Sequence, residues 1–343
     1  MLNDFDLALP QVPQSWYFFC AEKALDKGPV SRMINDRELV AFRTESGVVA
    51  VLDGRCPHMG ISLAKGVVKG QSIQCALHHW CFSPEGHCTH IPAQSDIPEP
   101  ARVRSYPCEL RHGMLFFFYG PKSLFPLPFY LESNPEAFCG SLPFRIEVGC
   151  PWFMLSGHHF DEQHIGVTHE REMLGPSSTS LPHRFARRAA AKFAVSGRSF
   201  RDSIWRALFG TQVEFDNTTW AGTISCTEAR FRRTTSYGMT FLAPMSADRT
   251  EVIFFAFARL GGGPAARLRA RMHARVRRYF IARFLEDDWT VLHGARYNPR
   301  SLLRADEPFR DYMTWLKEIA VSVPEGKELN VHTPKEVRLC EHA

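Results

Sequence analysis

Two short segments, each pairing one cysteine with one histidine, constrain the fold of this chain more than any other feature. They are Cys56-x-His58 and Cys75-x-x-His78, and sixteen residues separate His58 from Cys75. Thiolate and neutral imidazole are ligands for zinc and for iron–sulfur centres. Glycines and prolines flank both segments, which suits tight loops closing over a metal. The sequence therefore predicts two metal-binding loops presented by a rigid scaffold.

The distribution of the ligands favours an iron–sulfur cluster over zinc. A structural zinc finger usually takes two cysteines from one loop and two histidines from the other. Here each loop supplies one of each. That arrangement is typical of a Rieske [2Fe–2S] cluster, in which two thiolates hold one iron and two imidazoles hold the other. Zinc is the alternative.

Four more cysteines and histidines near these loops are interpreted as structural residues: His79, Cys81, Cys88 and His90. Six further cysteines are scattered along the chain without a pattern and are expected to be buried thiols. These are Cys20, Cys108, Cys139, Cys150, Cys226 and Cys340.

The 343 residues suggest two domains. Residues 15–120 contain short β-like runs divided by turns, including a hairpin pattern over Leu39–Gly54 around a Glu-Ser-Gly turn. A proline-rich passage follows, and residues 121–343 combine further β-like runs with a long helical pattern over about 265–293. We therefore expect an α+β protein: a small antiparallel β domain that holds the cluster, and a larger domain with an antiparallel sheet packed by long helices.

A second candidate metal site is Asp161-x-x-His164-x4-His169. Histidines five apart on a regular helix point about 140° apart, so these two can share an ion only where the helix unwinds. Gly166 lies between them and would permit that distortion, as would a π-bulge. Two histidines and a carboxylate form the face that binds non-haem Fe(II) in oxygenases. The alternative is a helix with incidental surface histidines, His158 and His159 included.

The late helical pattern supplies the carboxylate. On a helical wheel its apolar residues define one face, formed by Phe280, Ile281, Phe284, Leu285, Val291 and Leu292. Asp288 falls within about 10° of the centre of this face, and Asp287 lies about 90° away. A carboxylate in a buried stripe is costly unless it is paired or bound to metal. Asp288 is therefore the predicted third ligand, and Asp287 and Glu286 are expected to face solvent or to pair with neighbouring arginines.

With these motifs in place, the chain resembles the catalytic α subunit of a Rieske non-haem iron oxygenase over most of its length. The resemblance implies cluster ligands Cys56, His58, Cys75 and His78. It also implies a mononuclear Fe(II) held by three further residues, which are His164, His169 and Asp288.

Asp161 matches the bridging aspartate of that family. In the family, electrons pass from the cluster of one subunit to the iron of its neighbour. The resemblance therefore implies a homotrimer in which Asp161 links His78 of one chain to His164 of the next. An N-cap of the ligand helix is the simpler role for Asp161, and the two roles are compatible. The chain departs from many relatives by Gly157, where they carry asparagine, and by His79, where they carry glycine.

The resemblance implies reductive activation of O2 and oxidation of a small molecule. Monohydroxylation or oxidative demethylation of a mostly apolar, aromatic or cyclic substrate is the favoured reaction, and cis-dihydroxylation of an aromatic ring is the alternative. A non-catalytic Rieske electron-transfer protein and a zinc-stabilised β domain are the rival classes. No dinucleotide fingerprint or plant-type ferredoxin cysteine run is present, so a separate NAD(P)H-dependent reductase or ferredoxin is expected.

The bulk composition excludes several other classes. A formal net charge of +5 is weak for this length and does not indicate a nucleic-acid partner. The first residues lack the pattern of a secretory signal. The most apolar runs are far shorter than a membrane span. A cytoplasmic protein without membrane segments is expected.

Overall fold

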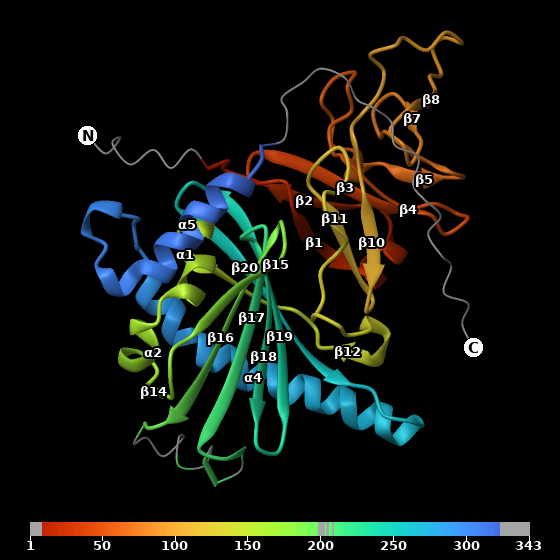
Figure 1. Ribbon diagram of the computed structural model, residues 1–343. Coiled ribbons are helices and arrows are strands. Elements are labelled where there is room, and N and C mark those ends of the chain that lie inside the picture. Colours follow the sequence, from red (N-terminus) through yellow and green to blue (C-terminus); the bar gives the residue numbers. More distant parts are fainter. Residues whose placement is uncertain (1–8, 198–202, 204–205, 208, 323–343) are drawn as a thin grey trace. The chain divides into compact units, whose positions relative to one another are not determined.

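The computed structural model describes residues 9–197, 203, 206, 207 and 209–322 (Figure 1). By its internal contacts the chain divides into two units. Val12–Leu127 form one and Pro128–Val321 the other. Each is described by itself below. Cys340, one of the scattered cysteines, lies outside the described residues.

The unit formed by Val12–Leu127 contains three antiparallel sheets. The first has the order β1-β11-β10, with β1 Trp16–Ala21, β10 Cys108–Arg111 and β11 Met114–Phe118. The second runs β2-β3-β4-β9, with β2 Val30–Ile34, β3 Arg37–Arg43, β4 Val49–Asp53 and β9 Ser105–Tyr106. The third runs β5-β6-β7-β8, with β5 Val67–Lys69, β6 Ser72–Gln74, β7 Cys81–Phe82 and β8 Cys88–His90.

The hairpin predicted over residues 39–54 is confirmed. Strands β3 and β4 pair in antiparallel register from Leu39 opposite Asp53 to Arg43 opposite Val49. Gly47, in the connecting turn, has a φ of 91°, which glycine adopts without strain. One hydrophobic cluster joins this hairpin to strands β6 and β7, and it includes both loop cysteines, Cys56 and Cys75. The thiols therefore lie inside the core of this unit.

The unit formed by Pro128–Val321 is built on a nine-stranded antiparallel sheet. Its main path is β12-β20-β19-β18-β17-β16-β14, while β13 pairs with β20 and β15 with β16. Its strands are β12 Phe138–Gly140, β13 Phe144–Val148, β14 Arg171–Met173, β15 Ser178–His183, β16 Ala186–Val195, β17 Gln212–Trp220, β18 Ile224–Phe231, β19 Thr235–Ser246 and β20 Arg249–Arg259.

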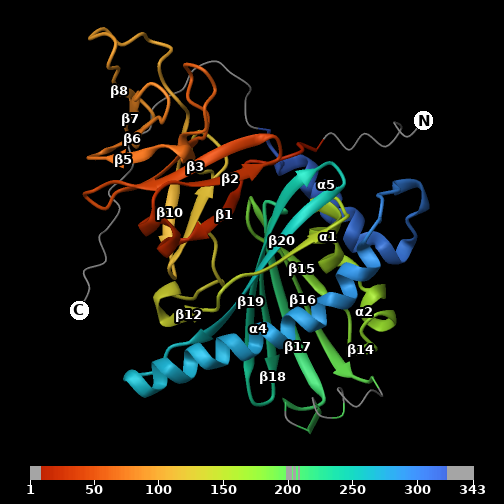
Figure 2. The ribbon, with the colours of Figure 1, turned by 180° about the vertical axis from the view of Figure 1, so that it is seen from behind.

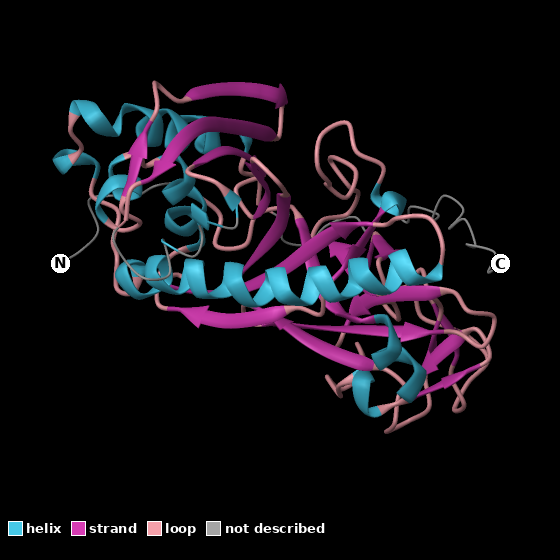
Figure 3. Cartoon of the chain, turned by 90° about the horizontal axis from the view of Figure 1, so that it is seen from below, coloured by secondary structure: helices cyan, strands magenta, loops and turns pink. Residues whose placement is uncertain are grey.

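Four α-helices belong to this unit within the described residues: α1 Trp152–Gly157, α2 Gln163–Val167, α4 Pro264–Leu292 and α5 Glu307–Ile319. The long helix predicted from the sequence is confirmed as α4. It packs against β20, β12, β13 and β19 and crosses one face of the sheet (Figures 2 and 3). The α+β fold class is confirmed. Among the described residues, no helix combines the length and apolar character needed to cross a bilayer.

The predicted apolar face of α4 is only partly correct. Phe280, Phe284 and Val291 are 51%, 40% and 67% exposed, although the wheel assigned them to a buried stripe. The helix instead meets the sheet through small residues, because Ala270 and Ala274 pack on Ala258 of β20. Asp288 and Trp289 are the only other buried residues of α4.

The other scattered cysteines agree largely with the prediction. Cys20, Cys150 and Cys226 are buried, and Cys108 and Cys139 are partly buried.

Candidate metal centres

The first cysteine–histidine loop is a tight turn closed by two backbone hydrogen bonds. The Cys56 amide donates to the Ile61 carbonyl at 2.9 Å, and the Gly60 amide donates to the Cys56 carbonyl at 2.8 Å. Gly60 has a φ of 71°, in the left-handed region that favours glycine.

The second loop repeats the same turn. The Cys75 amide donates to the Trp80 carbonyl at 2.8 Å, and the His79 amide donates to the Cys75 carbonyl at 3.1 Å. In both loops the residue four positions after the cysteine has a positive φ, and in this loop it is His79, with a φ of 57°. Two loops of one geometry thus present one thiol and one imidazole each.

The four predicted cluster ligands divide into a buried side and an exposed side. Cys56 and Cys75 are each 2% exposed and form no disulfide, whereas His58 and His78 are exposed. The two imidazole rings lie 4.6 Å apart between centroids, and the Trp80 ring stacks on His58 at 4.6 Å. The two thiols and the two imidazoles therefore form separate pairs.

This separation fits a two-iron cluster better than a single zinc ion. Only two groups of three or more side chains in the described residues have ligand atoms within 4.8 Å of one another, and neither includes a residue of these loops. Ligands of one tetrahedral ion would converge more closely. Burial, with the neighbouring Cys75 thiol, raises the pKa of Cys56 to about 11. The Cys56 thiol is therefore protonated without metal, and metal binding would displace its proton.

The strained residue in the second loop leads to a prediction about stability. His79→Gly should raise the free energy of unfolding by about 1 kcal/mol. A left-handed conformation costs a side-chain-bearing residue roughly 1–2 kcal/mol, and the greater freedom of glycine in the unfolded chain offsets part of the gain. Thermal unfolding of the cluster-loaded protein measures the change. His79→Ala is the control, because it removes the imidazole but keeps the strain. Equal effects of the two variants would contradict the prediction.

The second candidate centre begins at α2. His164 lies on this helix, and His169 lies beyond its end at Val167. The helix therefore does end between the two histidines, as their spacing required for a shared ion. Gly166 is helical, and the backbone turns only after the helix, where Glu170 has a φ of 50°.

Asp288 meets both histidines from α4. Ligand atoms of His164, His169 and Asp288 all lie within 4.8 Å of one another. Asp288 Oδ1 is 2.7 Å from His169 Nε2, and the two side chains are 8% and 2% exposed. Despite this short distance, Asp288 Oδ1 has no hydrogen bond of acceptable geometry among the described residues. A buried carboxylate oxygen and an imidazole nitrogen this close to each other are expected where both ligate one ion.

The electrostatics of the site suit a metal. Burial, reinforced by the charge of His158, lowers the pKa of His164 to about 3, so the imidazole is neutral and its lone pair is available. Burial alone would raise the pKa of Asp288, but contact with His158 and His169 lowers it below its usual value. Two histidines and one carboxylate form the donor set typical of non-haem Fe(II).

Asp161 caps α2, as predicted, and its second carboxylate oxygen lies near His164. Its Oδ1 accepts hydrogen bonds from the amides of Gln163 and His164 at 3.0 and 3.4 Å, so it caps the first turn of α2. Its Oδ2 lies 3.8 Å from His164 Nδ1, a buried nitrogen without a hydrogen bond in the described residues. The Asp161 side chain is 35% exposed.

One residue of the centre was missed by the sequence analysis. His158, considered there only as an incidental surface histidine, is 13% exposed in its side chain, and its Nε2 lies 3.3 Å from Asp288 Oδ1. It also belongs to the second group of close ligand atoms, with Asp161 and His164. The spacing of His158 from the other site residues does not mark it as a member of the centre. It comes close to them only because the backbone is irregular between α1 and α2.

Gly157, the departure from the family's asparagine, has a packing explanation. A Cβ atom at this position would lie 2.5 Å from a ring carbon of Phe309 and 3.1 Å from one of Tyr312. Both aromatic residues lie on the buried face of α5. Glycine is therefore the residue that lets α5 pack against the end of α1.

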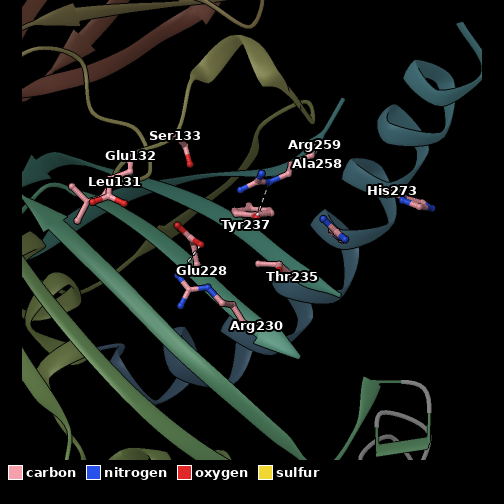
Figure 4. Close-up of a pocket in the computed structure, with 11 residues that line it drawn as sticks. Leu131, Glu132, Ser133, Glu228, Arg230, Thr235, Tyr237, Ala258, Arg259 and His273 are labelled. Atoms are coloured by element: carbon pink, nitrogen blue, oxygen red, sulfur yellow. Dashed lines mark hydrogen bonds and ion pairs between the residues drawn. The ribbon is translucent and has the colours of Figure 1, made fainter. Parts of the chain in front are cut away.

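A pocket of about 640 Å³ lies elsewhere in this unit, lined from β18, β19, β20, α4 and the segment 131–133 (Figure 4). Arg259 Nε donates to the Tyr237 hydroxyl at 3.1 Å, and Arg230 Nη2 donates to Glu228 Oε2 at 3.2 Å. The lining is largely polar and includes no residue of either candidate centre. We therefore do not assign this pocket to the apolar substrate predicted from the sequence.

Comparison with known proteins gives one domain match. Residues 15–107 match the family described as the Rieske [2Fe-2S] domain. Aminopyrrolnitrin oxygenase PrnD of Pseudomonas fluorescens is 33% identical over 171 residues, covering 47% of this chain and 47% of that protein. The 3-chlorobenzoate-3,4-dioxygenase oxygenase subunit of Comamonas testosteroni is 37% identical over 160 residues, covering 42% of this chain and 35% of that protein. The matched part of this chain thus spans less than half of each relative.

The fold is also similar to that of a solved structure. Dicamba monooxygenase bound to dicamba aligns with a TM-score of 0.62 at 18% identity, covering 90% of this chain and 98% of that one. At this identity the likeness is one of fold.

Proposed function

We infer that this chain, which contains a Rieske [2Fe-2S] domain over residues 15–107, is the terminal oxygenase component of a Rieske-type system. The observation that carries the inference is the presence of two different candidate centres in one chain. Paired thiols and imidazoles stand in the two loops, and His164, His169 and Asp288 converge separately. On this proposal residues 15–120 are the cluster domain and residues 121–343 the catalytic domain.

The proposed cofactors follow from the donor sets. Cys56, His58, Cys75 and His78 would hold the [2Fe–2S] cluster, which matches the arrangement of Rieske ligands. His164, His169 and Asp288 would hold one Fe(II). Iron bound there would supply O2 activation, using electrons delivered one at a time by the cluster.

The protein side chains prepare the second centre for that chemistry. His164 is kept neutral by burial, so it can ligate through one nitrogen while the other faces Asp161. Asp288 supplies a negative charge in a largely dehydrated site, which offsets the charge of a bound cation. The His169 ring stacks on Phe284 of α4 at 4.1 Å between centroids, which restricts its rotation.

The exposed edge formed by His58 and His78 supports electron transfer with another protein surface, because the buried thiols would keep the other edge inside the core. The proposed electron donor is a separate NAD(P)H-dependent reductase or a ferredoxin. The family resemblance adds a homotrimer in which Asp161 lies between the cluster of one subunit and the iron of the next. The exposed apolar residues of α4 offer surface that such a partner chain would cover.

The proposed reaction is monohydroxylation or oxidative demethylation of a mostly apolar, aromatic or cyclic small molecule. Cis-dihydroxylation of an aromatic ring is the second candidate, since one matched relative is named a dioxygenase subunit. A non-catalytic electron carrier is disfavoured, because such a protein would not need the converging residues of the second centre.

The first test is the metal and sulfide content of anaerobically purified protein, measured with its visible spectrum. About three irons and two acid-labile sulfides per chain are expected for one cluster and one mononuclear site. An iron content of two atoms per chain that does not rise when Fe(II) is added would support the electron-carrier alternative. Zinc without sulfide would exclude the oxygenase. Incorporation of one or both atoms of 18O2 into product then separates the two candidate reactions.

A further inference from the structure

His158 and the proposed iron ligand His169 both face one carboxylate oxygen of Asp288. His158 Nε2 lies 3.3 Å from Asp288 Oδ1, and His169 Nε2 lies 2.7 Å from that same oxygen. His158 Nε2 and Asp288 Oδ1 are both buried and without a hydrogen bond of acceptable geometry among the described residues. A buried nitrogen this close to a buried carboxylate is placed to donate to it after a small rotation of the ring.

The contact with His164 indicates that His158 supports the ligands and does not itself bind the ion. The two rings lie 3.6 Å apart between centroids with an angle of 32° between their planes, so their faces are in tilted contact. An imidazole ligates through a lone pair in the plane of its ring. Two rings in face contact at this distance and tilt direct their in-plane lone pairs nearly side by side, and His164 is one of the converging group with His169 and Asp288.

The backbone around His158 is held firmly enough to fix this geometry. His158 begins the short 3₁₀ turn His158–Phe160, directly after α1. The Phe160 ring stacks on Tyr312 of α5 at 4.6 Å, and the Tyr312 hydroxyl is hydrogen-bonded to Ser156 Oγ of α1. Helix α5 therefore anchors the turn on both sides of His158. The adjacent His159 differs, because its Nδ1 pairs with the Ser156 carbonyl at 3.2 Å.

We propose that His158 is a positioning residue of the iron centre. In its Nε2-protonated tautomer it donates to Asp288 Oδ1, and its ring supports the face of His164. One side chain would thus orient two of the three proposed ligands, which come from α2 and α4. Partners of ligating groups usually have this orienting role. The inference rests on the proposed function, because it concerns the same iron centre.

The test compares Fe(II) binding in variants that separate donation from stacking. His158→Phe keeps a ring against His164 and removes the donor, whereas His158→Gln keeps an N–H group within reach of Asp288. The dissociation constant for Fe(II) is measured by equilibrium dialysis on protein that retains its cluster but has lost its mononuclear iron. We expect His158→Phe to weaken binding about 10- to 100-fold, as for other partners of metal ligands. His158→Gln should stay close to the wild-type value.

His159→Gln is the matched control, since it changes the neighbouring histidine without touching Asp288. Cluster absorbance and thermal unfolding of each variant identify any that fails to fold. Wild-type affinity in His158→Phe would overturn the inference, and so would equal losses in His158→Phe and His158→Gln. If the wild-type protein itself binds no Fe(II) beyond its cluster, the proposed function is wrong. This result differs from the two results above, which would overturn only the role of His158.

Discussion

Replacing Asp288 with alanine is expected to empty the second centre and abolish product formation while leaving the cluster intact. Asp288 is the one carboxylate that approaches His169, at 2.7 Å, among the described residues. Without Asp288 only the two imidazoles remain. They are expected to bind Fe(II) more weakly than two imidazoles and a carboxylate together. Iron should fall from about three to about two atoms per chain with sulfide unchanged. Turnover should fall by more than about 100-fold, beyond the effect of changing a ligand's partner.

Asp287→Ala is the control for this experiment, because Asp287 is adjacent and exposed. It should retain the iron and the activity of the wild-type protein. Loss of iron in Asp287→Ala with retention in Asp288→Ala would reverse the assignment of the third ligand. Iron and sulfide analysis with a product assay is sufficient to decide.

Asp161→Asn is expected to lower turnover about 10- to 100-fold, the usual cost of changing a group that supports a metal ligand. The substitution retains an oxygen that can cap α2 but removes the negative charge 3.8 Å from His164 Nδ1. The rate at which the reduced cluster is reoxidised by O2 in the presence of substrate measures the effect.

Asp161→Ala separates this effect from capping. Loss of the cap costs about 1 kcal/mol in addition, so this variant should unfold more readily than Asp161→Asn. If Asp161→Asn reoxidises at the wild-type rate, Asp161 is only a cap, and electron transfer through it is contradicted.

The cluster loops could be predicted because the proposed ligands of each loop lie within four residues of sequence. A thiol and an imidazole two or three positions apart define a loop, and the pairing of unlike ligands selects a cluster over zinc. The shared turn of the two loops was not predicted, since it depends on pairing between backbone groups at Cys56 and Ile61 and at Cys75 and Trp80. With that turn known, position 79 is seen to require a left-handed backbone, which glycine adopts without strain.

The second centre was predicted less completely, because its residues come from separate elements. Helical geometry required unwinding between His164 and His169, but it could not place the end of α2 at Val167. Asp288 was predicted as a ligand because it lay at the centre of a stripe expected to be buried. Asp288 is buried, but Phe280, Phe284 and Val291 of the same stripe are exposed. His158 could not be identified from spacing, because it lies beside His164 only through the irregular backbone between α1 and α2.

The convergence of His164 and Asp288 also bears on how the chain unfolds. An ion held by both would cross-link two positions separated by about 120 residues of chain, and loop-closure entropy makes such long-range clips effective. For a covalent link of similar span the unfolded chain is destabilised by about 5 kcal/mol. A bound ion would thus act as a reversible cross-link between α4 and the segment that carries the histidines. The free energy needed to separate the two would then depend on how much of the protein holds iron.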